Sequence, residues 1–166
     1  MKARTSVMMA LLLAFALPLA AQAQWRLGTH AGYDVDVADF LIGANAQFTV
    51  PGAAISGVPL QFSPGFDFYP GVGDGVSYWI VDLDAHYPIQ ARGVQPFVGG
   101  GLYMSRASVD AGTLGSFSDT NVGLNLIGGA EFGSHDVIRP YAEGRFRVGS
   151  GSTFIIKGGL SFILGR

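Results

Sequence analysis

Asp82, Asp84 and His86 are the residues whose types and spacing first suggest chemistry. In an extended strand, residues at i, i+2 and i+4 point to one face, so two carboxylates and an imidazole would lie together. Such a set could ligate a metal or serve in acid–base catalysis. It could equally form salt bridges with cations on other strands, and the rest of the sequence favours this interpretation.

Other ionisable residues alternate in the same way. Glu143, Arg145 and Arg147 occupy alternate positions of one segment. The remaining members of the set are Arg26, His30, Asp67, Glu131 and Lys157. The glycines at 71, 73 and 75 resemble a phosphate loop only superficially, because no lysine and no strand-to-helix context follows. We predict paired charges, with no catalytic group, metal site or cofactor.

These residues lie in eight segments that alternate apolar and polar residues with the period of a half-buried β-strand. In seven of the segments no ionisable residue falls on the apolar face, whereas Gly99, Gly100 and Gly101 blur the orientation of the fifth. The predicted strands are 25–34, 39–50, 59–69, 77–87, 95–106, 121–132, 138–148 and 152–164. The predicted connections are 35–38, 51–58, 70–76, 88–94, 107–120, 133–137 and 149–151.

Four strand segments carry aromatic residues eight positions apart. The pairs are Trp25 and Tyr33, Phe40 and Phe48, Trp79 and Tyr87, and Phe154 and Phe162. Because eight is even, both members face the same side of a strand, about 26 Å apart. A strand tilt of about 40° reduces this to roughly 20 Å, close to the apolar band between the aromatic girdles of an outer-membrane barrel.

The first 23 residues have the layout of a secretory signal peptide. Lys2 and Arg4 form a basic start, an apolar stretch over 7–21 follows, and Ala21-Gln22-Ala23 places small residues at the cleavage site. As a membrane-spanning helix the stretch would be short, since Pro18 interrupts it. We therefore predict a signal peptide at 1–23 and one barrel domain at 24–166. The absence of cysteine excludes disulfides and a lipoprotein anchor.

The composition narrows the class of protein further. Charged residues make up 13% of the chain, about half the usual share for a soluble domain. No Lys/Arg cluster exists, which argues against nucleic-acid binding. Outside the first 23 residues no apolar run reaches membrane length, so the apolar residues are distributed by alternation.

Alternation alone leaves two barrels possible. A soluble lipocalin-like barrel would place the apolar face inside around a ligand, whereas a membrane barrel places it outside. The polar face is rich in Gly, Ser and Asn and carries few charged residues for a water-facing exterior. The aromatic residues lie near strand ends. Both observations favour a closed, eight-stranded, antiparallel up-and-down transmembrane β-barrel.

The chain resembles the small outer-membrane β-barrel proteins of the OmpA-like, OmpX-like and opacity-type families. The resemblance rests on PFVGGGLY at 96–103 and RPYAEGRFRV at 139–148, and on the last strand. There Lys157, Gly159, Phe162 and Leu164 match the spacing of the family's assembly signal, although the chain continues with Gly165 and Arg166 instead of stopping at an aromatic residue. The resemblance implies recognition by the barrel assembly machinery and residence in outer-membrane lipid.

An eight-stranded interior is just wide enough to be filled by side chains. Charges buried there need partners. We expect a plug of salt bridges in which Glu131 and Glu143 pair with Arg145, Arg147 or Lys157, since these residues lie on neighbouring strands.

The sequence favours a monomer with a structural or surface-interaction role. With the N-terminus on the periplasmic side, segment 107–120 would be the longest outer loop and could contact an extracellular partner. The alternative is a narrow or gated channel for small solutes. A lipid-modifying enzyme is disfavoured, because His30 and His86 would face the lumen and His135 would lie in a periplasmic turn beside Asp136.

Overall fold

The computed structural model describes residues 25–73, 75–110, 115–133 and 137–164. The predicted signal peptide lies outside these residues. Within them, no helix is long and apolar enough to cross a membrane. The strands are β1 (Trp25–Asp34), β2 (Asp39–Ile55), β3 (Val58–Tyr69), β4 (Val76–Pro88), β5 (Val94–Asp110), β6 (Ser116–Phe132), β7 (Ile138–Val148) and β8 (Ser152–Leu164).

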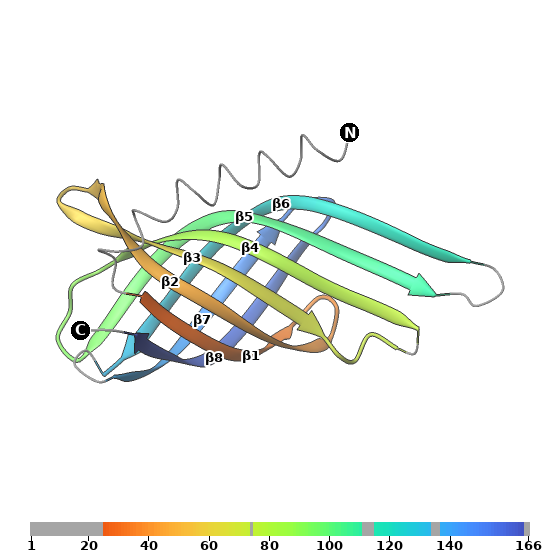
Figure 1. Ribbon diagram of the computed structural model, residues 1–166, viewed down its shortest axis with the longest axis horizontal. Coiled ribbons are helices and arrows are strands. Elements are labelled where there is room, and N and C mark those ends of the chain that lie inside the picture. The colour runs from red at the N-terminus through yellow and green to blue at the C-terminus, as the bar shows by residue number, and fades with distance from the viewer. Residues whose placement is uncertain (1–24, 74, 111–114, 134–136, 165–166) are drawn as a thin grey trace.

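The strands form one closed antiparallel barrel in chain order, which confirms the predicted fold class (Figure 1). Each strand pairs with its neighbours in sequence, and β1 closes the barrel against β8 from Trp25–Leu164 to Asp34–Ile155. Closure leaves no open sheet edge around the wall, as hydrocarbon surroundings require.

The alternating pattern places the apolar face outward. Leu83 and Leu124 are 54% and 56% exposed, whereas Asp67 and Arg147 are buried inside at 0% and 1%. This arrangement is the reverse of a soluble ligand-binding barrel. The lipocalin-like alternative is therefore wrong.

The predicted turn at 51–58 is also wrong, because β2 and β3 continue to a two-residue turn at Ser56 and Gly57. Both turn residues have positive φ, 50° and 78°, as in the type I′ turn that favours tight hairpins. Gly52, with φ of 86°, lies where the β2–β3 register shifts between Thr49 and Ala54. The Pro51-Gly52 pair therefore marks an irregularity in the strand instead of its end.

The predicted outer loop at 107–120 is largely a β-hairpin. β5 and β6 stay paired through Ala107–Asp119 and Val109–Phe117 to Asp110–Ser116. Figure 1 shows this hairpin, with the start of β4 paired beside β5, extending beyond the other strands. Residues 107–110 and 115–120 alternate polar and apolar side chains too weakly to be recognised as strands from their sequence.

The structure also orients β5, which the sequence left open. Phe97 and Tyr103 are buried inside, and Leu102 and Met104 are exposed outside. Gly99 and Gly101 therefore face the lumen, where β-carbons would collide with the backbone and side chains of His86 and Asp84 on β4.

Candidate functional site

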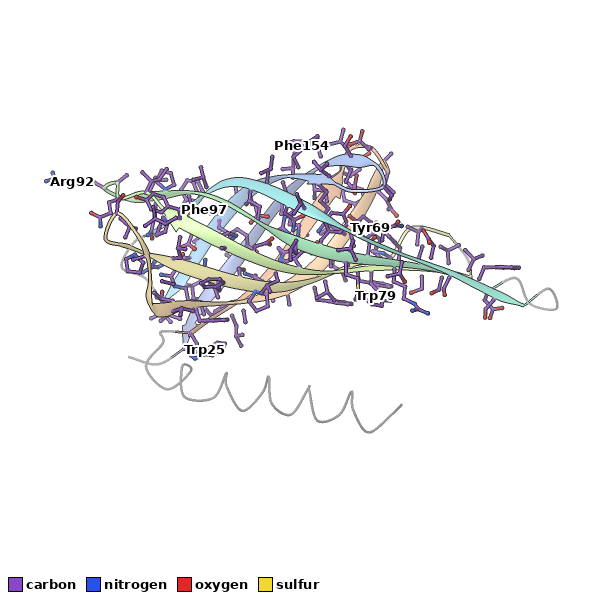
Figure 2. All side chains as sticks on the ribbon, turned by 90° about the horizontal axis from the view of Figure 1, so that it is seen from above. Trp25, Tyr69, Trp79, Arg92, Phe97 and Phe154 are labelled. Carbon is purple, nitrogen blue, oxygen red and sulfur yellow. The ribbon has the colours of Figure 1, made fainter. Side chains whose placement is uncertain are left out.

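Aromatic side chains on the outer wall lie at two levels. Trp25 pairs with Phe48 across β1 and β2, with ring centroids 4.8 Å apart, and Tyr33 pairs with Phe40 at 5.1 Å. Figure 2 places Trp79 and Phe154 towards the end from which the β5–β6 hairpin extends, and Trp25 towards the opposite end. Tyr87 lies opposite Val98, and Phe162 lies opposite Leu27.

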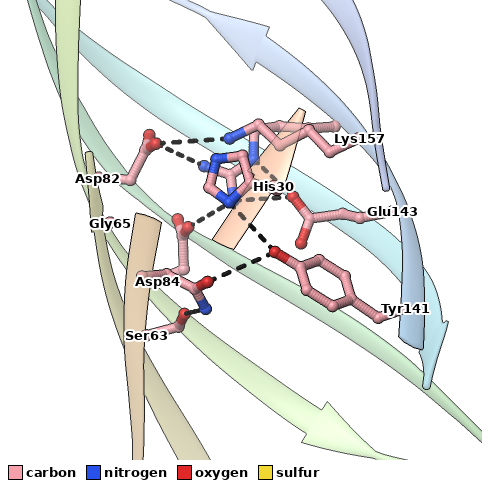
Figure 3. A pocket seen from close by; sticks show the side chains of 10 residues that line it. His30, Ser63, Gly65, Asp82, Asp84, Tyr141, Glu143 and Lys157 are labelled. Carbon is pink, nitrogen blue, oxygen red and sulfur yellow. Dashed lines mark hydrogen bonds and ion pairs between the residues drawn. The ribbon is translucent and has the colours of Figure 1, made fainter. Parts of the chain in front are cut away.

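Arg145 on β7 is the centre of the lumenal charge network. Its Nη2 lies 2.8 Å from Asp84 Oδ2 and 2.8 Å from Glu143 Oε1, and its Nη1 lies 2.9 Å from Asp82 Oδ2. Asn125 donates hydrogen bonds to Asp82 and Asp84 at 2.9 and 2.8 Å. The predicted pairing of Glu143 with Arg145 is therefore present. Figure 3 shows Asp82 and Asp84 on one side of the lumen and Glu143 on the other.

A second group of charges surrounds Asp67 on β3. Lys157 Nζ lies 2.6 Å from its Oδ2, Arg147 Nη2 lies 2.9 Å from the same oxygen, and His30 Nε2 lies 2.6 Å from Oδ1. Arg147 Nη2 also lies 3.0 Å from Asp82 Oδ2, which joins this group to the Arg145 group. These pairs cross the barrel interior, so the two groups form one continuous network.

Glu131 does not take the predicted partners. It pairs instead with Arg26 Nη1 at 2.8 Å and Arg139 Nη1 at 3.6 Å. The prediction was wrong because it chose other cations of β7 and β8, whereas Arg139 on the neighbouring β7 and Arg26 on β1, which reaches across the lumen, take these places. An eight-stranded interior is narrow enough for a long guanidinium side chain to span it.

Asp82, Asp84 and His86 do not converge on one point. The two carboxylates turn to Arg145 and Asn125, whereas the His86 ring stacks on Phe97 with centroids 4.8 Å apart. His86 Nδ1 lies 3.5 Å from Gln47 Nε2. Within the described residues, no group of three or more His, Asp or Glu side chains is placed to hold a metal ion.

A layer of buried, mostly apolar side chains lies in the lumen beside the charges, and it was not predicted from the sequence. The layer consists of Leu41, Tyr69, Ile80, Tyr103 and Ile155, all at most 7% exposed. Three of its members stand two positions from a charged residue on the same strand: Tyr69 from Asp67, Ile80 from Asp82, and Ile155 from Lys157. The sequence did contain a signal for this layer, because Ile80 and Ile155 stand at inward-facing positions of β4 and β8.

The free space within the network is small. One cavity of about 20 Å³ is lined by His30, Tyr141, Glu143 and Lys157 among others. A second, also about 20 Å³, lies beside His86, Phe97 and Glu131. Each has room for about one water molecule.

The residues of the predicted assembly signal have different surroundings. Lys157 points into the lumen, where it contacts Asp67, and Gly159 lies on the same inward face. Phe162 and Leu164 alternate to the outer face, where Leu164 is 48% exposed. Lys157 therefore belongs to the charge network whatever its part in assembly.

Comparison with known proteins identifies the class of fold. The structure is similar to the N-terminal β-barrel domain of Pseudomonas aeruginosa OprF, with a TM-score of 0.66, 14% identity, and coverage of 86% of this chain and 100% of that one. It is also similar to Neisserial surface protein A (NspA), with a TM-score of 0.58, 18% identity, and coverage of 86% of this chain and 96% of that one. A third similar structure is the outer membrane enzyme PagL, with a TM-score of 0.51, 12% identity, and coverage of 85% of this chain and 99% of that one.

No protein-family model and no curated protein matches the sequence. The fold is nevertheless that of the eight-stranded outer-membrane β-barrels. Within that class, this chain has a lumen filled by a continuous charge network and an adjoining apolar layer.

Proposed function

We propose that the protein is a monomeric, integral outer-membrane barrel that anchors a protruding β-sheet at the cell surface. In this proposal the N-terminal segment 1–23 directs export, and the barrel assembly machinery inserts the barrel into outer-membrane lipid. The role is structural and interactive, with contact to other surface molecules made by the β5–β6 hairpin.

The observation that carries the proposal is the closed lumen. Asp82 and Arg145 bridge it at 2.9 Å, and Asp67 and Lys157 bridge it at 2.6 Å. Tyr69, Ile80 and Ile155 pack together at the adjoining level. Because side chains fill the lumen at two levels, the outer end of the barrel is the region that we infer to be available for function.

The protruding hairpin offers a definite contact surface. β6 pairs with β7 only from Leu124–Val148 onwards, whereas its pairing with β5 continues to Ser116. Residues 116–121 therefore have β5 on one side only, over about 20 Å of strand. Such an edge can accept an extended segment of another polypeptide by strand addition. Phe117, 66% exposed, would add apolar contact.

The test compares cells that express the full protein with cells in which residues 107–120 are replaced by a short Asn-Gly turn. We expect the full protein to promote attachment of cells to one another, and the shortened barrel to lose this effect. Heat-modifiable mobility on detergent gels shows that both barrels are folded. Equal attachment by both strains would contradict a surface role for the hairpin.

A narrow channel is the second candidate, favoured by the polar lining of the two lumenal cavities. Both cavities are bordered by Asn45, Tyr141 and Glu143, so they follow each other along the lumen. A pathway would need the charge network and the apolar layer to rearrange. Single-channel conductance distinguishes this function from a structural one.

We assign no catalytic activity. PagL shows that an enzyme can have this type of fold. Here, however, His30 is held between Asp67 and Tyr141 inside the barrel, and His86 is buried against Phe97. Altered lipid A acylation on expression of the protein would contradict this assignment.

A further inference from the structure

A groove of about 450 Å³ lies on the outer wall across β1, β2 and β3. Its sides are Leu27 and Phe66, and the side chains between them are the small Thr29, Ala44 and Ala46. The backbone of neighbouring inward-facing residues forms its floor. No charged residue lines the groove.

The aromatic pairs fix the depth of this groove in the bilayer. Thr29 lies opposite Ala44, and this pair stands midway in register between Trp25–Phe48 and Tyr33–Phe40. Aromatic side chains of membrane barrels concentrate at the two interfaces. The groove therefore lies at the middle of the bilayer, where the surrounding molecules present hydrocarbon chains.

The β2–β3 ladder is interrupted beneath the groove. Asn45–Gly65 and Phe48–Phe62 are paired in one register, but the intervening pairs at Ala46 and Gln47 are missing. Pro64, which would face Ala46, has no N–H to donate. Its pairing with Leu83 on β4 is intact, so the missing bond lies on the β2 side.

Asn45 and Gly65 also line the first lumenal cavity, on the other side of the wall. The lumen and the lipid are thus separated here by one thickness of backbone with an incomplete hydrogen-bond ladder. Pro64 therefore leaves this stretch of the wall one backbone hydrogen bond short, at a place where only apolar and small side chains cover the outer surface.

We propose that the groove holds one hydrocarbon chain of a membrane phospholipid, packed over the β2–β3 seam. This inference rests on the membrane location in the proposed function. A thin, flexible chain fits between the projecting Leu27 and Phe66 side chains. The convex wall of a second barrel does not, and a stable dimer would need roughly 800 Å² from each partner.

The experiment measures lipid retained by the barrel after release from vesicles of palmitoyl-oleoyl phosphatidylethanolamine and phosphatidylglycerol, using native mass spectrometry. Ala44→Phe fills the groove, and Ala142→Phe places the same ring on the lipid-facing side of β7 as a matched control. We expect one retained phospholipid on the wild-type protein and on Ala142→Phe, and none on Ala44→Phe.

Ala46→Leu fills the groove with a smaller side chain and serves if Ala44→Phe does not fold. It is expected to lose the retained phospholipid as well. A folded, vesicle-inserted wild-type barrel without retained lipid, or equal retention by wild type and the filled variants, would overturn the groove proposal. Failure of the wild-type chain to insert would instead overturn the membrane location.

Discussion

At the residue scale, the lumen depends on cations that each contact several acids. Arg145 contacts Asp82, Asp84 and Glu143, and Arg147 contacts Asp67 and Asp82. Removing one such cation leaves several buried carboxylates without their partner. The cost of an uncompensated buried charge is much larger than the net value of the intact pair.

Arg145→Leu is therefore expected to lower the free energy of unfolding by about 3–5 kcal/mol. Arg106→Leu is the matched control, because Arg106 lies exposed in the hairpin and donates a hydrogen bond to Ser118 Oγ at 3.2 Å. This substitution should change stability little. Urea unfolding in lipid vesicles, followed by heat-modifiable mobility, measures both. Equal stability of the two variants would show that the network does not hold the barrel together.

At the element scale, glycines determine how closely β4 and β5 approach. A β-carbon at Gly101 would overlap Leu83 O and the Asp84 side chain and would lie 2.6 Å from Asp84 Cα. Gly128 on the outer face of β6 has no heavy atom within 4 Å of the same position. Comparing alanine substitutions at Gly101 and Gly128 therefore separates the steric cost of an added β-carbon from the effect of losing the glycine's backbone freedom.

Gly101→Ala should destabilise the barrel by about 1–3 kcal/mol, as expected for overpacking, whereas Gly128→Ala should not. The measurement is the midpoint of urea unfolding together with the yield of compact, heat-modifiable protein. A Gly101→Ala barrel as stable as Gly128→Ala would mean that β4 and β5 can separate without loss.

At the scale of the whole molecule, the lumen has two barriers in series. The charge network fills one level, and Leu41, Tyr69, Ile80, Tyr103 and Ile155 fill the next. Hydrophobic constrictions block conduction by excluding water even where no charge is present. Neutralising a single charge should therefore leave the second barrier in place.

In planar bilayers we expect no steady conductance from wild type or from Arg145→Ala. Adding Ile80→Ala and Ile155→Ala to Arg145→Ala removes part of both barriers and should produce channel events, while the double isoleucine variant alone should not. Steady conductance of the wild-type barrel would favour the channel function. Conductance of Arg145→Ala alone would show that the charges are the limiting barrier.

The sequence by itself determined the strands and the two faces of each, because a period of two fixes which residues share a face whatever the fold around them. The bounds of β1, β7 and β8 and the inward set from Arg26 to Lys157 follow from this local rule. The tertiary structure alone decided which charges meet, since Arg26 and Glu131 lie on strands that are not neighbours. It also decided the extent of the β5–β6 hairpin, where cross-strand pairing outweighs a weak local pattern, and the groove at Pro64, which requires three strands in register.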